Sequence, residues 1–150
     1  MFQAEIKPVE YTKNNIHVLQ LLDRSLFNNS WSEEQWKHEF DNSFTSIYIM
    51  TNKSDNNIGF MTVSTIDQTL EIRKIGILLP YQRQGLASIF MNKVYQLSKE
   101  NNIQRIILEV NEKNNPAVMF YKKSGFQIFN QRRNYYAPDQ NALCMQKYFC

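Results

Sequence analysis

The segment Gln82-Arg83-Gln84-Gly85-Leu86-Ala87 lies between a predicted strand and a predicted helix. Gly85 and Ala87 have little or no side chain, so a ligand could approach the backbone closely there. Free N–H groups at a helix start, helped by the helix dipole, bind phosphate oxygens. This composition fits a phosphate-binding loop, although an ordinary turn that needs glycine for its backbone conformation would also explain it.

Glu109 is a candidate general base because it interrupts the apolar run Ile106–Val110. A carboxylate on a central strand loses hydration, and burial raises a carboxyl pKa toward the range that suits a base near neutral pH. Alternatively, Glu109 lies at a strand end and reaches water or a partner arginine.

Tyr121 follows an Asn-Pro pair and is a candidate proton donor, since an unperturbed phenol has a pKa of about 10. It could equally be a core aromatic residue beside Ala117 and Phe120. The segment Arg132-Arg133-Asn134-Tyr135-Tyr136 could form a solvated hairpin or a wall of a substrate site.

Apolar periodicity predicts the elements that hold these residues. Two short helices are expected within residues 15–29 and 32–40, the second opened by Ser32 and Gln35 at capping-box spacing. A later helix should be capped by Asn115 and end at Gly125. The remaining expected elements are a helix over Leu86–Glu100 and strands over Ser46–Thr51, Ile58–Ile66, Leu70–Leu79, Arg105–Val110, Phe126–Asn130 and Ala142–Tyr148.

The apolar residues of Leu70–Leu79 change phase near Arg73–Lys74, which indicates one extra residue in the ladder and hence a β-bulge. The strand Arg105–Val110 has apolar residues on both faces and should be central. This order of elements predicts an α/β sandwich with a mixed sheet and helices on both faces. We find no repeat or linker, so residues 1–150 are expected to form one domain.

Composition excludes several classes of function. The net charge of +3 is too small for a dedicated nucleic-acid binder, yet it is compatible with a phosphate-bearing ligand. Cys144 and Cys150 are expected to be reduced thiols in a cytoplasmic protein, and no ligand-spaced cluster suggests a metal. No signal peptide or membrane-spanning run is expected.

Together and in this order, these segments resemble the GNAT superfamily of acetyltransferases, and within it the RimI-type ribosomal-protein alanine N-acetyltransferases. The similar blocks are KIGILLPYQRQGLA, LEVNEKNNPAVMFYKKSGF, RRNYY and, more weakly, WSEEQWKHEF, which span residues 31 to about 145. Three positions depart from the family pattern: Pro80 comes one place late, Asn141 replaces an acidic residue, and no proline precedes Trp31.

The resemblance implies a GNAT-like fold, with a mixed, mostly antiparallel twisted sheet, helices on both faces and a splayed, bulged central strand. It implies acetyl-CoA as cosubstrate, Glu109 as general base and Tyr121 as general acid. The residues implied to contact acetyl-CoA are Ile75, Gly76 and Ile77 on the strand, Gln82, Arg83, Gln84, Gly85, Leu86, Ala87 and Ser88 around the pyrophosphate, and Asn114.

The resemblance further implies that the acceptor is a protein N-terminus, such as the N-terminal alanine of a small-subunit ribosomal protein. Two alternatives stay open: acetylation of another amine, such as a small molecule, a polyamine or a lysine, and a non-catalytic module that binds acyl-CoA. The presence of both Glu109 and Tyr121 argues against the module. No nucleic-acid or membrane partner is expected.

Overall fold

The computed structural model describes residues 4–149, which form a seven-stranded sheet in the order β1-β2-β3-β4-β5-β7-β6. Neighbouring strands are antiparallel except for β4 and β5, which are parallel. The expected mixed, mostly antiparallel sheet is therefore confirmed. The strands are β1 (Ala4–Pro8), β2 (Thr45–Asn52), β3 (Asn57–Ile66), β4 (Thr69–Ile77), β5 (Arg105–Asn111), β6 (Gln127–Ala137) and β7 (Gln140–Tyr148).

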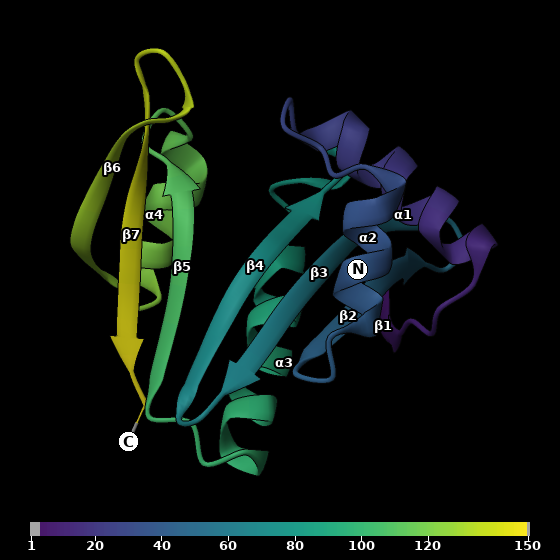
Figure 1. The fold of residues 1–150 in the computed structure, drawn as a ribbon, viewed down its shortest axis with the longest axis horizontal. Helices are drawn as coiled ribbons and strands as arrows, with labels where there is room; N and C mark the ends of the chain where they lie inside the picture. The colour runs from purple at the N-terminus through teal and green to yellow at the C-terminus, as the bar shows by residue number, and fades with distance from the viewer. Residues whose placement is uncertain (1–3, 150) are drawn as a thin grey trace.

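Helices cover both faces of the sheet, as predicted (Figure 1). On one face, α1 (Lys13–Leu26) and α2 (Glu33–Asp41) bury Leu19 and Trp36 against β2 and β3. On the other face, α3 (Leu86–Glu100) and α4 (Asn115–Lys123) bury Phe90 and Val118 against the sheet. Ser32 and Gln35 form the expected capping box at the start of α2.

One strand was not predicted, and two predicted strands end at other residues than expected. β1 was missed because only two of its five residues, Ala4 and Ile6, are even partly buried. β6 extends to Ala137, well past the predicted Asn130, because it is an exposed edge strand whose polar sequence is ordered by pairing with β7. Leu79 is not in β4: it begins a short 3-10 helix, η1 (Leu79–Tyr81), and is 77% exposed.

The predicted bulge in β4 is confirmed at Arg73. Thr62 of β3 pairs with Lys74, whereas the next residue, Val63, pairs with Ile72, so Arg73 is the extra residue. The predicted splay is confirmed at the same place. β4 and β5 pair only from Thr69 to Ile72, while β5 continues against β7 to Asn111. Figure 1 shows β4 and β5 close together at one end and diverging toward the other.

Candidate active site

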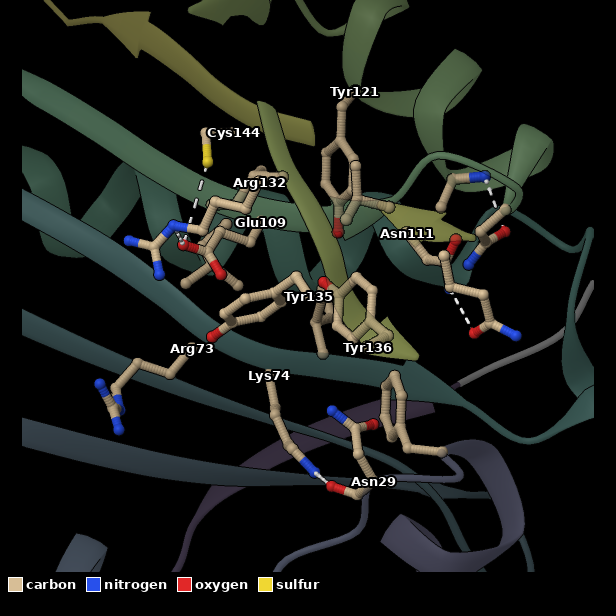
Figure 2. Close-up of a pocket in the computed structure, with 18 of the residues that line it drawn as sticks. Asn29, Arg73, Lys74, Glu109, Asn111, Tyr121, Arg132, Tyr135, Tyr136 and Cys144 are labelled. Atoms are coloured by element: carbon tan, nitrogen blue, oxygen red, sulfur yellow. Dashed lines mark hydrogen bonds and ion pairs between the residues drawn. The ribbon is translucent and has the colours of Figure 1, made fainter. Parts of the chain in front are cut away.

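A cleft of about 870 Å³ occupies the region where β4 and β5 separate. Tyr121, Asn114 and Ala117 of the α4 region line it from one face of the sheet, whereas Trp31 and Tyr135 line it from the other. The cleft therefore passes through the gap in the sheet, and two ligands entering from opposite faces could meet there. Figure 2 shows Tyr121 pointing from α4 toward Tyr136, with Glu109 nearby.

Glu109 lies in this cleft, and of its two interpretations the buried carboxylate was wrong. Its neighbours Leu108 and Val110 point into the core beside α3 and α4, so Glu109 points to the opposite face. Its side chain is 30% exposed, and its Oε1 lies 3.2 Å from Arg132 Nε. The alternative interpretation, a carboxylate paired with an arginine, is the one observed. Arg132 is itself 53% exposed, so a cationic ligand could displace it at little cost.

Tyr121 is both a core aromatic residue and a lining residue of the cleft. It is only 5% exposed, and its ring packs edge-on against Phe120 and Phe126. Burial, and to a smaller extent Tyr136, raises the pKa of the Tyr121 phenol. The phenol therefore keeps its proton near neutral pH, as a proton donor must.

The splayed half of β4 presents backbone groups to the cleft. Leu78 donates its N–H to Ile58 O of β3 at 2.8 Å. Because backbone groups alternate in direction along a strand, the N–H and C=O of Ile75 and Ile77 point away from β3, toward the gap. Gln82 Nε2 already donates to Ile77 O at 2.7 Å. At Gly76 a Cβ would lie 2.6 Å from Leu26 Cδ1, and the contact of its backbone with acetyl-CoA stays a prediction.

The predicted phosphate loop lies outside the cleft, at the start of α3. Gly85 caps α3 with a left-handed φ of 78°, and no atom within 4 Å would meet a Cβ at that position. No side chain caps this helix, and the first N–H groups of a helix have no intrahelical acceptor. Gln82–Gly85 and Ser88 are exposed, whereas Leu86 is buried, so Leu86 could contact a ligand only through its backbone.

Asn114 caps α4, where Asn115 was expected. Its Oδ1 accepts a hydrogen bond from Ala117 N at 3.3 Å, and Asn115 is the first residue of the helix. Asn114 also lines the cleft. Its Nδ2 has no hydrogen-bond partner among residues 4–149, which leaves a donor available to a ligand. Gly125, with a φ of 92°, follows the end of α4 as expected.

The β6–β7 hairpin brings Tyr135 and Tyr136 over the cleft. The ladder between the strands is interrupted from Arg132 to Ala137. There Asn141 supplies hydrogen bonds in place of the ladder: its Oδ1 accepts from Asn134 N at 2.8 Å, and its Nδ2 donates to Glu112 Oε1 at 2.8 Å. An amide can make both bonds, whereas an ionised carboxylate can make only the first, which explains an asparagine where the resembled family has an acid.

Asn141→Asp should therefore weaken the hairpin, because it removes the donor and places a second carboxylate beside Glu112. Losing a hydrogen bond to a charged group should lower the free energy of unfolding by about 1–3 kcal/mol at pH 7, toward the low end for this half-exposed site. Urea denaturation measures the change. Asn141→Ser shortens the side chain, so that its hydroxyl cannot bridge both Asn134 and Glu112, but it adds no charge. If Asn141→Asp is no less stable than Asn141→Ser at pH 7, the role given to Glu112 is wrong.

The segment 27–31 between α1 and α2 forms the wall opposite Tyr135. Sequence reasoning singled out Trp31, as a departure from the family pattern, but missed residues 27–29. Phe27, Asn28, Asn29 and Trp31 line the cleft from this segment. The run Phe-Asn-Asn-Ser carries no motif, and only its place after a helix would have suggested a loop. Cys144 is a buried free thiol, as expected, but its place beside Glu109 was not foreseen: its Sγ lies 3.9 Å from Glu109 Oε1. Cys150 lies outside the described residues.

Within residues 4–149, no group of three or more His, Cys, Asp or Glu residues could hold a metal ion. None of the helices described is long and apolar enough to span a membrane.

Comparisons of the sequence with a family model and with known proteins all give acetyltransferases. Residues 16–126 match the acetyltransferase (GNAT) family. A ribosomal protein bS18-alanine N-acetyltransferase of Haemophilus influenzae is 30% identical over 122 residues, covering 79% of this chain and 82% of that protein. The N-alpha-acetyltransferase 50 of Danio rerio is 28% identical over 139 residues, covering 89% of this chain and 82% of that protein.

Two solved structures share the fold. The ribosomal-protein-S18-alanine N-acetyltransferase from Escherichia coli has a TM-score of 0.86 and 19% identity, covering 97% of this chain and 94% of that chain. The spermidine N-acetyltransferase from Vibrio cholerae, solved with CoA and spermine, has a TM-score of 0.79 and 19% identity, covering 97% and 95%. At these identities, the likeness concerns the fold alone.

Proposed function

The chain belongs to the GNAT acetyltransferase family, and we propose that it transfers an acetyl group from acetyl-CoA to the N-terminal amine of a protein. The preferred acceptor in this proposal is the N-terminal alanine of a small-subunit ribosomal protein. The observation that carries the proposal is the cleft through the splayed sheet, because it gives donor and acceptor separate entrances to one point.

The donor side fits acetyl-CoA, which supplies an activated acetyl thioester. The outward-pointing backbone groups of Ile75 and Ile77 would bond the pantetheine arm in the gap left by β5, with Asn114 as a further donor. The open start of α3, from Gln82 to Ser88, would bind the pyrophosphate through its N–H groups, and the absence of a side chain at Gly85 lets the phosphates approach the backbone.

The chemical step needs a base and benefits from an acid. An α-amine has a pKa of about 8 and is mostly protonated at neutral pH. Glu109 would accept that proton directly or through water, which its 30% exposure admits. The amine then attacks the thioester carbonyl, and a backbone N–H near Ile77 would stabilise the oxyanion. As the carbon–sulfur bond breaks, Tyr121 would protonate the departing thiolate.

The acceptor side fits an extended chain with a free amine. Arg132 now pairs with Glu109, and an incoming ammonium group would replace its guanidinium there. Tyr135 and Tyr136 on one wall and Asn28 and Asn29 on the other offer hydroxyl and amide groups to a peptide backbone. The sequence likeness to the bS18-alanine acetyltransferase supports this acceptor. A polyamine is the second candidate, because the Glu109 carboxylate would pair with any ammonium group.

A panel of acceptors tests the proposal. The protein is incubated with acetyl-CoA and with peptides that begin with alanine, serine, methionine or leucine, and the added acetyl mass is located by tandem mass spectrometry. We expect the alanine peptide to have the highest kcat/KM. The control is the same peptide with a blocked N-terminus and an internal lysine. Faster acetylation of spermidine, or of that lysine, would reject the protein N-terminus as the acceptor.

A further inference from the structure

The segment 27–31 forms a wall of the cleft although it belongs to no helix or strand. An irregular segment has no ladder of backbone hydrogen bonds to hold it, so its position must depend on side chains around it. Two of its residues are held by one buried ion pair. Lys74 Nζ of β4 lies 2.7 Å from Asp23 Oδ1 of α1, with the lysine side chain 8% exposed and the aspartate side chain fully buried.

Each member of this pair holds a different part of the segment. The second oxygen of Asp23, Oδ2, accepts a hydrogen bond from Trp31 N at 2.8 Å. Lys74 donates to Asn29 O at 3.4 Å, and this bond is visible in Figure 2. The ammonium group also lies 4.9 Å from the ring centre of Phe27 and 4.6 Å from that of Trp31.

The bulge in β4 puts Lys74 in this position. Without an extra residue, consecutive side chains would point to opposite faces, and only one of Arg73 and Lys74 could face the helices. With it, both do: Lys74 pairs with Asp23 of α1, and Arg73 pairs with Glu39 of α2 at 2.7 Å. Two residues later, the missing side chain of Gly76 leaves room for Leu26 and Phe27.

We propose that the Asp23–Lys74 ion pair positions the acceptor indirectly. It fixes the segment 27–31 at the distance from the opposite wall of the cleft that an acceptor chain requires. This inference rests on the proposed function. Lys74 points toward Asn29 and away from Glu109, so it acts through the wall and not on the reacting atoms (Figure 2). Loss of the ion pair should raise the KM for the acceptor and leave the affinity for acetyl-CoA unchanged.

A role in stability alone explains the pair less well. Burial lowers the pKa of the Lys74 ammonium from its usual value, and the hydrogen bond and charge of Asp23 oppose that shift. The charged form is thus kept at a cost of desolvation, and buried ion pairs are often no better for stability than apolar pairs of similar volume. An apolar pair, however, could hold neither the Asn29 carbonyl nor the Trp31 amide.

The double variant Asp23→Leu/Lys74→Met separates the two roles, because it removes both charges together and should fold. We expect the acceptor KM to rise about tenfold or more. A misplacement of about 1 Å in a substrate-positioning contact can lower the reaction rate about 10²-fold. The Kd for acetyl-CoA, measured by calorimetry, should not change. Amide exchange in residues 27–31 should become faster. An unchanged acceptor KM would overturn the proposal.

Two single variants provide a matched comparison. Asp23→Asn keeps the shape, but its amide offers one acceptor where Lys74 and Trp31 need two. Glu39→Gln likewise removes one buried carboxylate charge that pairs with the bulge, but Glu39 makes no hydrogen bond to residues 27–31 and reaches them only through Arg73, which lies 5.7 Å from the ring centre of Trp31. We expect Asp23→Asn alone to raise the acceptor KM. Equal increases in both variants would indicate general loosening and would overturn the specific role of Asp23.

The activity of the wild-type protein distinguishes a failure of the proposed function from a failure of the positioning role. If it acetylates no peptide but does acetylate another amine, the proposed acceptor is wrong, and the variants are then compared for KM with that amine. If it acetylates peptides and the double variant does so with the same KM, the function stands and the positioning role is wrong.

Discussion

Replacing Glu109 by glutamine should lower kcat about 10²- to 10⁴-fold, the usual contribution of a positioned acid or base. Glutamine keeps the shape of the side chain and removes its ability to accept the proton. Affinity for acetyl-CoA should hardly change, because Glu109 faces the acceptor side of the sheet. The fold should survive, since the ion pair that Glu109 forms within residues 4–149 is with the half-exposed Arg132.

The pH dependence of this loss gives a sharper test. As pH rises through the amine pKa of about 8, more acceptor arrives already deprotonated and needs no base. The ratio of wild-type to variant kcat/KM should therefore shrink between about pH 7 and pH 9.5. A constant ratio across this range would mean that Glu109 contributes by positioning or by charge and does not accept the proton.

Tyr121→Phe is the matched comparison for Glu109→Gln. It keeps the packing of the ring against Phe120 and Phe126 and removes only the hydroxyl group. Because a thiolate is a tolerable leaving group, we expect a smaller loss. Burial raises the pKa of Tyr121, so its protonation does not change near neutral pH and a higher pH should give no rescue.

Near-wild-type rates in the folded Glu109→Gln variant would end the assignment of Glu109 as the base.

Local signals in the sequence predicted most of the elements but not their mutual contacts. The bulge was predictable because an extra residue shifts the alternation of apolar side chains within β4 itself. The glycine turn before α3 was predictable for a similar reason, since Gly85 needs only its neighbours to cap that helix. The side of the sheet to which Glu109 points was not predictable. The apolar residues around it gave no sign that the helices leave one side of β5 uncovered.

Contacts between distant segments could not be predicted from one sequence. The pairing of Asp23 with Lys74 joins residues 51 positions apart, and no local pattern marks either residue as a partner. Asn141 was recognised as a departure from the family pattern, yet its reason lies in Glu112 and Asn134, which approach it only when β6, β7 and β5 assemble. The walls of the cleft therefore emerge only from the fold.

Gly85→Glu should weaken acetyl-CoA binding about 10²-fold, because it places a carboxylate where the pyrophosphate is proposed to bind. At about 4 Å, two like charges repel by roughly 1–4 kcal/mol, depending on how well water screens them. Calorimetric titration with CoA measures the loss directly and does not require an acceptor. High salt should recover part of the affinity, because exposed charges are screened.

Gly85→Ala separates charge from backbone strain. Both substitutions replace glycine at a φ of 78°, a conformation that costs an L-residue about 1–2 kcal/mol. The added Cβ itself meets no atom within 4 Å, so alanine introduces strain without a clash. If the loop binds phosphate, alanine should lose little CoA affinity and glutamate much more. Equal losses in the two variants would attribute the effect to the backbone, and unchanged affinity in Gly85→Glu would place the pyrophosphate elsewhere.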